Sequence, residues 1–101
     1  VLVHRSINTL EALMVIVLAH AFIRPEAVDN VAAAARIQAH TSRTEPGCLQ
    51  YEVLQTLDQP TRIATTERYR SRDAFDAHMA APHTHAFLAV VGAAVTAAPV
   101  I

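Results

Sequence analysis

The sequence predicts an α+β domain in which a four-stranded antiparallel sheet carries helices on one face. Three observations lead to this prediction. The chain has 101 residues, which is the size of one domain. Segments with the two-residue period of a strand occur beside segments with the 3.6-residue period of a helix. Their order is β, α, β, β, α, α, β, which is the order of a ferredoxin-like split βαβ domain.

The first strand is expected at Val15–Phe22, a continuous apolar run that indicates burial on both faces. Residues 1–13 show no clear period, so we treat them as an N-terminal extension and residues 14–101 as the domain. The apolar stretch 12–22 also resembles the core of a signal peptide, but it is too short to span a bilayer. We favour the strand because the run joins directly to a helix start that the fold needs.

The first helix is expected to begin at Pro25 and Glu26, since proline suits the first turn and an acid suits the helix dipole. It should end near Ser42, before the chain breaks at Pro46 and Gly47. Its apolar stripe follows helical spacing and comprises Val28, Val31, Ala32 and Ala35.

A hairpin should follow, with strands at about 48–57 and 62–70 and a turn at 58–60. Alternation along the second of these strands separates two faces. One face carries Ile63, Thr65, Glu67 and Tyr69. The other face carries Arg62, Thr66, Arg68 and Arg70.

The C-terminal part of the chain predicts two more helices. Ser71 is a good N-cap for the first, in which Phe75, His78 and Met79 should face inward. Pro82 should end that helix, and another should run over 84–95. Residues 99–101 look like the start of a fourth strand.

Composition excludes several partners. The formal net charge is −1 and no basic stripe is present, so nucleic acid is not an expected partner. No segment is long enough for a membrane span. The single cysteine, Cys48, allows no disulfide within the chain and fits the reducing cytoplasm. Hydrophobic residues make up 52%, which hints at a subunit interface, and a second copy is the simplest cover for the open sheet face.

Two blocks of sequence resemble the antibiotic biosynthesis monooxygenase family. The first is residues 45–51, EPGCLQY, at a turn and strand start. The second is ERYRS at 67–71, followed by Ala74-Phe75, by His78 and by APH at 81–83. The spacing matches from about residue 15 to 95. Two departures are that Tyr69 stands where many relatives have tryptophan and that the last strand is short or missing.

This resemblance implies a dimeric α+β barrel with a pocket between sheet and helices in each subunit. Members include cofactor-free monooxygenases of anthrones and quinols, and the wider superfamily includes haem-degrading enzymes and a sugar-phosphate isomerase. The haem reading is disfavoured because the chain has no tryptophan. The isomerase reading remains an alternative, although the arginines of 62–70 lie on the strand face opposite Tyr69.

A cofactor-free oxygenase needs a base, a means to hold the substrate anion and a dry pocket. His78 is the expected base, because a neutral imidazole suits this task near pH 7. Glu67 is expected to orient His78, and Tyr69 to donate a hydrogen bond to a developing oxyanion. Each of the three has a structural alternative as a hydrogen-bonded core residue.

Four residues are expected to bind the substrate. Tyr51 can donate a hydrogen bond and stack on a ring, and Phe75 lies one helical turn before His78. His83 stands at a helix start, where a capping or surface role is the alternative. His20 shares a strand face with Leu18 and lies on either the pocket side or the dimer side.

We expect no cofactor and no metal. The chain has two glycines and lacks a phosphate-binding loop, a dinucleotide fingerprint and a nucleophile elbow. His78 and His83 straddle Pro82, and no neighbouring carboxylate completes a ligand set. The expected partners are a small aromatic substrate and molecular oxygen. Two other readings stay open: a non-enzymatic ligand-binding dimer, and a structural domain whose pocket is filled by side chains.

Overall fold

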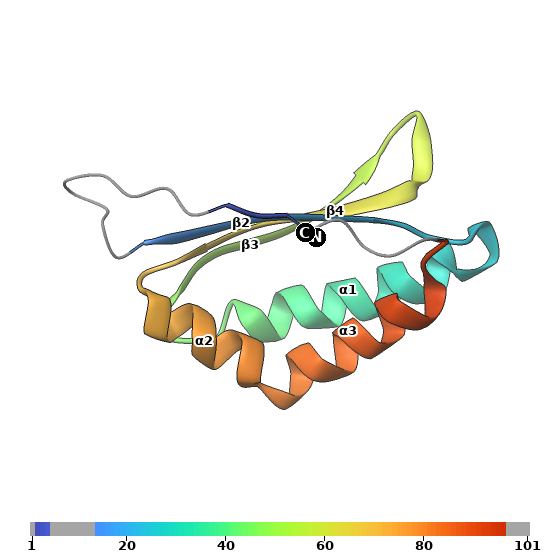
Figure 1. The fold of residues 1–101 in the computed structure, drawn as a ribbon. Coiled ribbons are helices and arrows are strands. Elements are labelled where there is room, and N and C mark those ends of the chain that lie inside the picture. The colour runs from blue at the N-terminus through green and yellow to red at the C-terminus, as the bar shows by residue number, and fades with distance from the viewer. Residues whose placement is uncertain (1, 5–13, 97–101) are drawn as a thin grey trace.

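The computed structural model describes residues 2–4 and 14–96. Figure 1 shows the sheet as one layer, with the three α-helices forming a second layer on one of its faces. This is the predicted α+β split βαβ fold. The elements are β1 (Leu2–His4), β2 (Val15–Phe22), a 3-10 turn η1 (Pro25–Ala27), α1 (Val28–Ser42), β3 (Cys48–Thr56), β4 (Gln59–Tyr69), α2 (Arg72–Ala80) and α3 (Pro82–Ala94).

The sheet has the strand order β1-β2-β4-β3, and every neighbouring pair is antiparallel. The apolar run is therefore a central strand, paired with β4 from Val15 opposite Tyr69 to Phe22 opposite Arg62. The expectation that β2 is buried on both faces is wrong within the single chain. Leu18 is 43% and Phe22 39% exposed, because helices cover only the opposite face.

The fourth strand comes from the N-terminal segment. β1 lies at the edge of the sheet and pairs with β2, with Val3 opposite Val17. Part of the segment that we treated as an extension thus completes the sheet. The strand predicted at 99–101 lies outside the described residues, although Val95 forms a bridge with Ile23 just before it.

The hairpin turn is tighter than predicted. It occupies Leu57 and Asp58, and β4 already begins at Gln59 rather than near Arg62. Proline can enter the strand here because β2 pairs with β4 only as far as Arg62. Beyond that point Pro60 has no β2 neighbour that would require its missing N–H.

The helices pack on the sheet through small and apolar side chains. In α1 the apolar stripe is buried at Val31 and Ala35, and it continues to a buried Gln38. The core beneath α1 and α3 is formed by Ala21, Ile23, Val31, Ile63, Val91 and Ala94. Residues Val15, Val17 and Tyr69 form a second cluster toward α2. In the described part of the chain, no helix has the length and apolar character needed to cross a membrane.

Two local features fix the position of α2. Ser71 caps it as predicted, because its side chain accepts a hydrogen bond from the backbone N–H of Ala74 at 3.1 Å. Gly47 lets the chain pass close to the first turn of the helix. A Cβ atom at Gly47 would lie 2.2 Å from the Cβ of Ala74, so no larger residue fits there without movement. This close approach brings Glu45 beside the far end of α2.

Candidate active site

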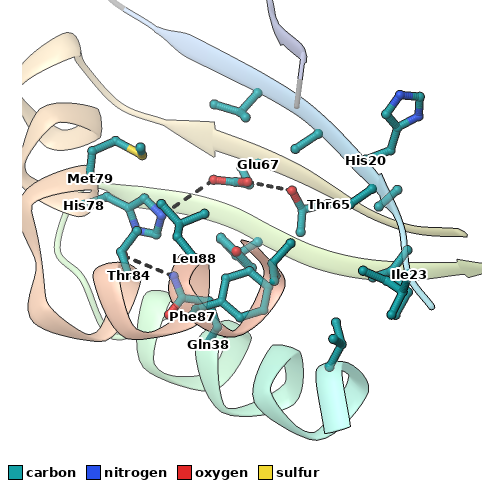
Figure 2. Close-up of a pocket in the computed structure, with 18 of the residues that line it drawn as sticks. His20, Ile23, Gln38, Thr65, Glu67, His78, Met79, Thr84, Phe87 and Leu88 are labelled. Carbon is teal, nitrogen blue, oxygen red and sulfur yellow. Dashed lines mark hydrogen bonds and ion pairs between the residues drawn. The ribbon is translucent and has the colours of Figure 1, made fainter. Parts of the chain in front are cut away.

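A pocket lies between the inner face of the sheet and the helices (Figure 2). Its cavity volume is about 100 Å³, so it is a small and partly open pocket. Most of its wall is apolar, with Ile23, Phe87 and Val91 among the lining residues. The reading in which side chains fill the interior stays an alternative to a ligand-binding pocket.

His78 lies at the polar end of this pocket. It is only 2% exposed, and its Nδ1 atom is 2.7 Å from Oε1 of Glu45. When the imidazole is neutral and donates to this carboxylate, its proton lies on Nδ1. The Nε2 atom then carries a lone pair, on the side of the ring where Glu67 lies at 3.7 Å.

Glu67 lies on the other side of His78 and is 6% exposed. Its two carboxylate oxygens accept hydrogen bonds from the Thr65 hydroxyl at 2.7 Å and from the Tyr69 hydroxyl at 2.5 Å. These bonds offset the cost of burying the carboxylate. Figure 2 shows Glu67 pointing from the sheet toward His78.

Gln38 is a site residue that the sequence reasoning missed. It is 2% exposed, and its amide donates to the Thr84 hydroxyl at 3.1 Å. Its carbonyl oxygen is 2.7 Å from Nδ1 of His83. Its side chain also lies near the Tyr51 hydroxyl and lowers the pKa of that group, against the larger effect of burial. The signal was present, because Gln38 continues the apolar stripe seven residues after Val31.

The two tyrosines are held in their neutral form. Burial, followed by the charge of Glu67, raises the pKa of Tyr51 well above its ordinary value of 10.0. The same causes raise the pKa of Tyr69 even further, and its hydrogen bond to Glu67 adds to the shift. Both hydroxyls therefore remain donors across the physiological range. Burial also raises the pKa of the Cys48 thiol, which fits an inert cysteine.

The structure brings six of the seven predicted site residues together around His78. Tyr51, Glu67, Phe75 and His78 line the pocket. Tyr69 does not, because it is 0% exposed and packs behind Glu67 with its ring centre 5.0 Å from that of His78.

His83 lies at the edge of this cluster, and His20 lies outside it. The ring of His83 lies 5.8 Å from that of His78, at the start of α3 and outside the pocket lining. His20 borders the pocket, but its ring points away from the helices (Figure 2). Its Nδ1 atom is 2.8 Å from Arg62.

One premise about metals is wrong. We reasoned that no carboxylate completes a set with His78 and His83, because none is near in sequence. Glu45, thirty-three residues before His78, lies between the two imidazoles. One ligand atom from each of the three residues lies within 4.8 Å of the others.

The chain is a small α+β domain with an apolar pocket under its sheet. An acid–histidine pair lies at one end of that pocket. These features are those of the class of small domains that bind an apolar ligand. Within that class, the chain belongs to the antibiotic biosynthesis monooxygenase family, whose model matches residues 14–90. The resemblance inferred from the sequence motifs is thereby confirmed.

Individual relatives agree with this assignment. Rv0793 of Mycobacterium tuberculosis, named for a monooxygenase activity, is 34% identical over 82 residues, which cover 81% of this chain and 80% of the relative. Its solved structure matches with a TM-score of 0.80 over 86% of this chain and 88% of that one.

More distant structures match as well. One from Caulobacter crescentus, titled as an antibiotic biosynthesis monooxygenase, has 26% identity and a TM-score of 0.80 over 87% of this chain and 84% of that one. A protein from Methanosarcina mazei has 20% identity and a TM-score of 0.81 over 87% of each chain, which shows the shared fold alone.

Proposed function

We propose that this chain is a cofactor-independent monooxygenase that oxidises a small aromatic hydroxyl compound, of the quinol or anthrone type, with molecular oxygen. The observation that carries the proposal is the contact of 2.7 Å between His78 Nδ1 and Glu45. It favours the tautomer in which the buried imidazole offers a lone pair at Nε2. A base held in this way needs little reorganisation before it accepts a proton.

The first step is transfer of the substrate hydroxyl proton to His78. The imidazolium that forms lies between two carboxylates, Glu45 at 2.7 Å and Glu67 at 3.7 Å. Both negative charges stabilise it, and the low polarity of the pocket strengthens that effect. Glu45 and Glu67 therefore act as positioning residues for the base.

The substrate anion is held by Tyr51 and by the apolar walls. Tyr51 lines the pocket and its raised pKa keeps the hydroxyl protonated, so it can donate a hydrogen bond to the substrate oxygen. The anion is electron-rich and passes one electron to oxygen, after which the two radicals combine. For an anthrone, the net change converts CH₂ and O₂ into C=O and H₂O. The substrate supplies all the electrons, so no flavin or metal is required.

Two other functions are less well supported by the pocket. A sugar-phosphate isomerase needs cationic groups, yet no arginine is among the described lining residues. Arg62 lies on the outer face of the sheet with His20, and Arg68 is exposed. A non-enzymatic ligand-binding protein would present a similar pocket, and turnover distinguishes it from an oxygenase.

A homodimer is part of the same proposal. The outer sheet face carries exposed Leu18, Phe22 and Leu54. The strand registers place these side chains on one surface, since Leu18 lies opposite Thr66 and Leu54 lies opposite Ala64. A second copy packed on this face would bury them. The reduced thiol of Cys48 supports a cytoplasmic location.

Oxygen uptake by purified, chelator-treated protein tests the function, with a panel of hydroquinones and anthrones as substrates. We expect uptake above autoxidation, a loss of at least about 100-fold in His78→Ala, and unchanged ligand affinity by thermal shift. The control is His85→Ala, an exposed histidine of α3 that should keep full activity. Ligand binding without uptake would instead support the non-enzymatic reading.

A further inference from the structure

Glu45, His78 and His83 form a compact three-residue group at the edge of the pocket. They come from the α1–β3 connection, from α2 and from the first turn of α3. One oxygen and two ring nitrogens lie within 4.8 Å of one another. We propose that this group binds a divalent transition-metal ion of the zinc type, and that the ion switches off the base. The switching effect rests on the proposed function, whereas the binding does not.

The distances suit such an ion with small side-chain movements. Glu45 Oε1 is 2.7 Å from His78 Nδ1, and Glu45 Oε2 is 3.6 Å from His83 Nε2. Zinc binds nitrogen and oxygen at about 2.0–2.2 Å, which places neighbouring ligand atoms about 3.3 Å apart in a tetrahedral site. The His78 contact must lengthen, and the Glu45 side chain must turn so that one or both of its oxygens reach the ion together with the two nitrogens.

Each imidazole has a group beside its second ring nitrogen, and that of His83 is already within hydrogen-bond distance. A metal-bound histidine usually donates its second ring N–H to a carbonyl or carboxylate. For His83 this partner is the Gln38 carbonyl oxygen, 2.7 Å from Nδ1. For His78 the nearest such group is Glu67, 3.7 Å from Nε2, which must move closer to accept a hydrogen bond. The buried amide of Gln38 thus orients the partly buried ligand His83, and Glu67 would neutralise part of the ion's charge.

An ion can reach the group from solvent. The side chains of Glu45 and His83 are 20% and 23% exposed, whereas that of His78 is 3% exposed. Water would complete the coordination at the exposed side. Two imidazoles and one carboxylate favour zinc and its neighbours over magnesium or calcium, which prefer oxygen ligands.

Metal binding and base catalysis use opposite forms of His78. As a base, the imidazole carries its proton on Nδ1 and presents the Nε2 lone pair to the substrate. As a ligand, it gives the Nδ1 lone pair to the ion and moves its proton to Nε2, where it faces Glu67. The lone pair needed by the substrate then disappears from the pocket, and the ion also takes Glu45 from its positioning role. A zinc-bound chain should therefore be inactive.

Isothermal titration of chelator-treated, tag-free protein with zinc chloride tests the binding. We expect one ion per chain and a Kd at least about tenfold weaker in His83→Ala and in Glu45→Gln. The matched control is His85→Ala, two residues along α3 and exposed, which should bind as the wild type does. Circular dichroism confirms that each variant is folded. No binding, or equal binding by His83→Ala and the wild type, would overturn the site.

A second measurement follows oxygen uptake at increasing zinc concentration, relative to each variant's own uninhibited rate. We expect inhibition of the wild type and of His85→Ala at the same concentration, and at least about tenfold more zinc to be needed for His83→Ala. Zinc bound at this group without inhibition would refute the switch. If no substrate shows uptake, the proposed function fails, while the titration still decides the metal site.

Discussion

Replacing Gly47 with alanine should destabilise the protein through one contact. The added Cβ would lie 2.2 Å from the Cβ of Ala74, whereas two methyl carbons pack at about 3.5–4.0 Å. The strand start and the first turn of α2 must therefore separate by about 1.5 Å. Overpacking of this kind costs about 1–3 kcal/mol. Since the separation also moves α2, the Glu45–His78 contact should lengthen and the oxygenase rate should fall.

The measurement is urea unfolding followed by circular dichroism. Gly92→Ala is the matched control, because nothing lies within 4 Å of a Cβ at that helical position. It should raise the free energy of unfolding by about 0.5–1 kcal/mol, since alanine suits a helix better than glycine. The double variant Gly47→Ala with Ala74→Gly removes the clashing methyl group and should recover part of the loss. Equal stability of Gly47→Ala and the wild type would refute the reasoning.

Three further predictions follow from the same structure. Both tyrosines of the chain, Tyr51 and Tyr69, should stay neutral while the protein is folded, so absorbance near 295 nm should show no tyrosinate until unfolding. Because the folded pKa values of both tyrosines are raised, each neutral tyrosine stabilises the folded state, fully so below pH about 10. As the pH rises further, the free energy of unfolding should fall by about 1.4 kcal/mol per pH unit for each tyrosine. A tyrosinate signal from folded protein would contradict this prediction. Ser71→Ala removes the cap of α2 and should lower the free energy of unfolding by about 1 kcal/mol, and Ser71→Thr, measured in parallel by urea unfolding, should keep most of it. Leu18→Glu places a charge on the proposed dimer face and should yield monomers in light scattering. Ile37→Glu, at an exposed position of α1, should leave the dimer intact. A monomeric wild type would exclude the proposed interface.

Much of the fold was predictable because local rules and packing agree. The alternation in 62–70 placed Glu67 and Tyr69 on the buried face, and Ser71 and Pro82 marked the helix starts and ends. The error at the hairpin has a local cause. We assigned Pro60 to the turn because proline cannot donate a backbone hydrogen bond within a sheet. At Pro60, however, β4 has no pairing with β2, so no hydrogen bond from this position to β2 is lost.

The candidate site was less predictable because its residues meet only in three dimensions. His78 and Glu67 were found from strand and helix periodicity, which says which face a side chain occupies. Glu45 was seen only as part of a motif, since nothing in its neighbourhood shows that its carboxylate meets α2. Its position depends on the close approach at Gly47, which is a property of packing rather than of sequence spacing.

The short helix α2 has a consequence for how a ligand enters the pocket. It has nine residues, against fifteen in α1 and thirteen in α3, yet it carries Phe75, His78 and Met79 of the pocket wall. A short segment between two turns opens at a lower free energy than the central strands. Local unfolding of α2 would expose the cavity while the sheet stays intact. A bound ligand should therefore slow amide hydrogen exchange in α2 far more than in β2 or β4.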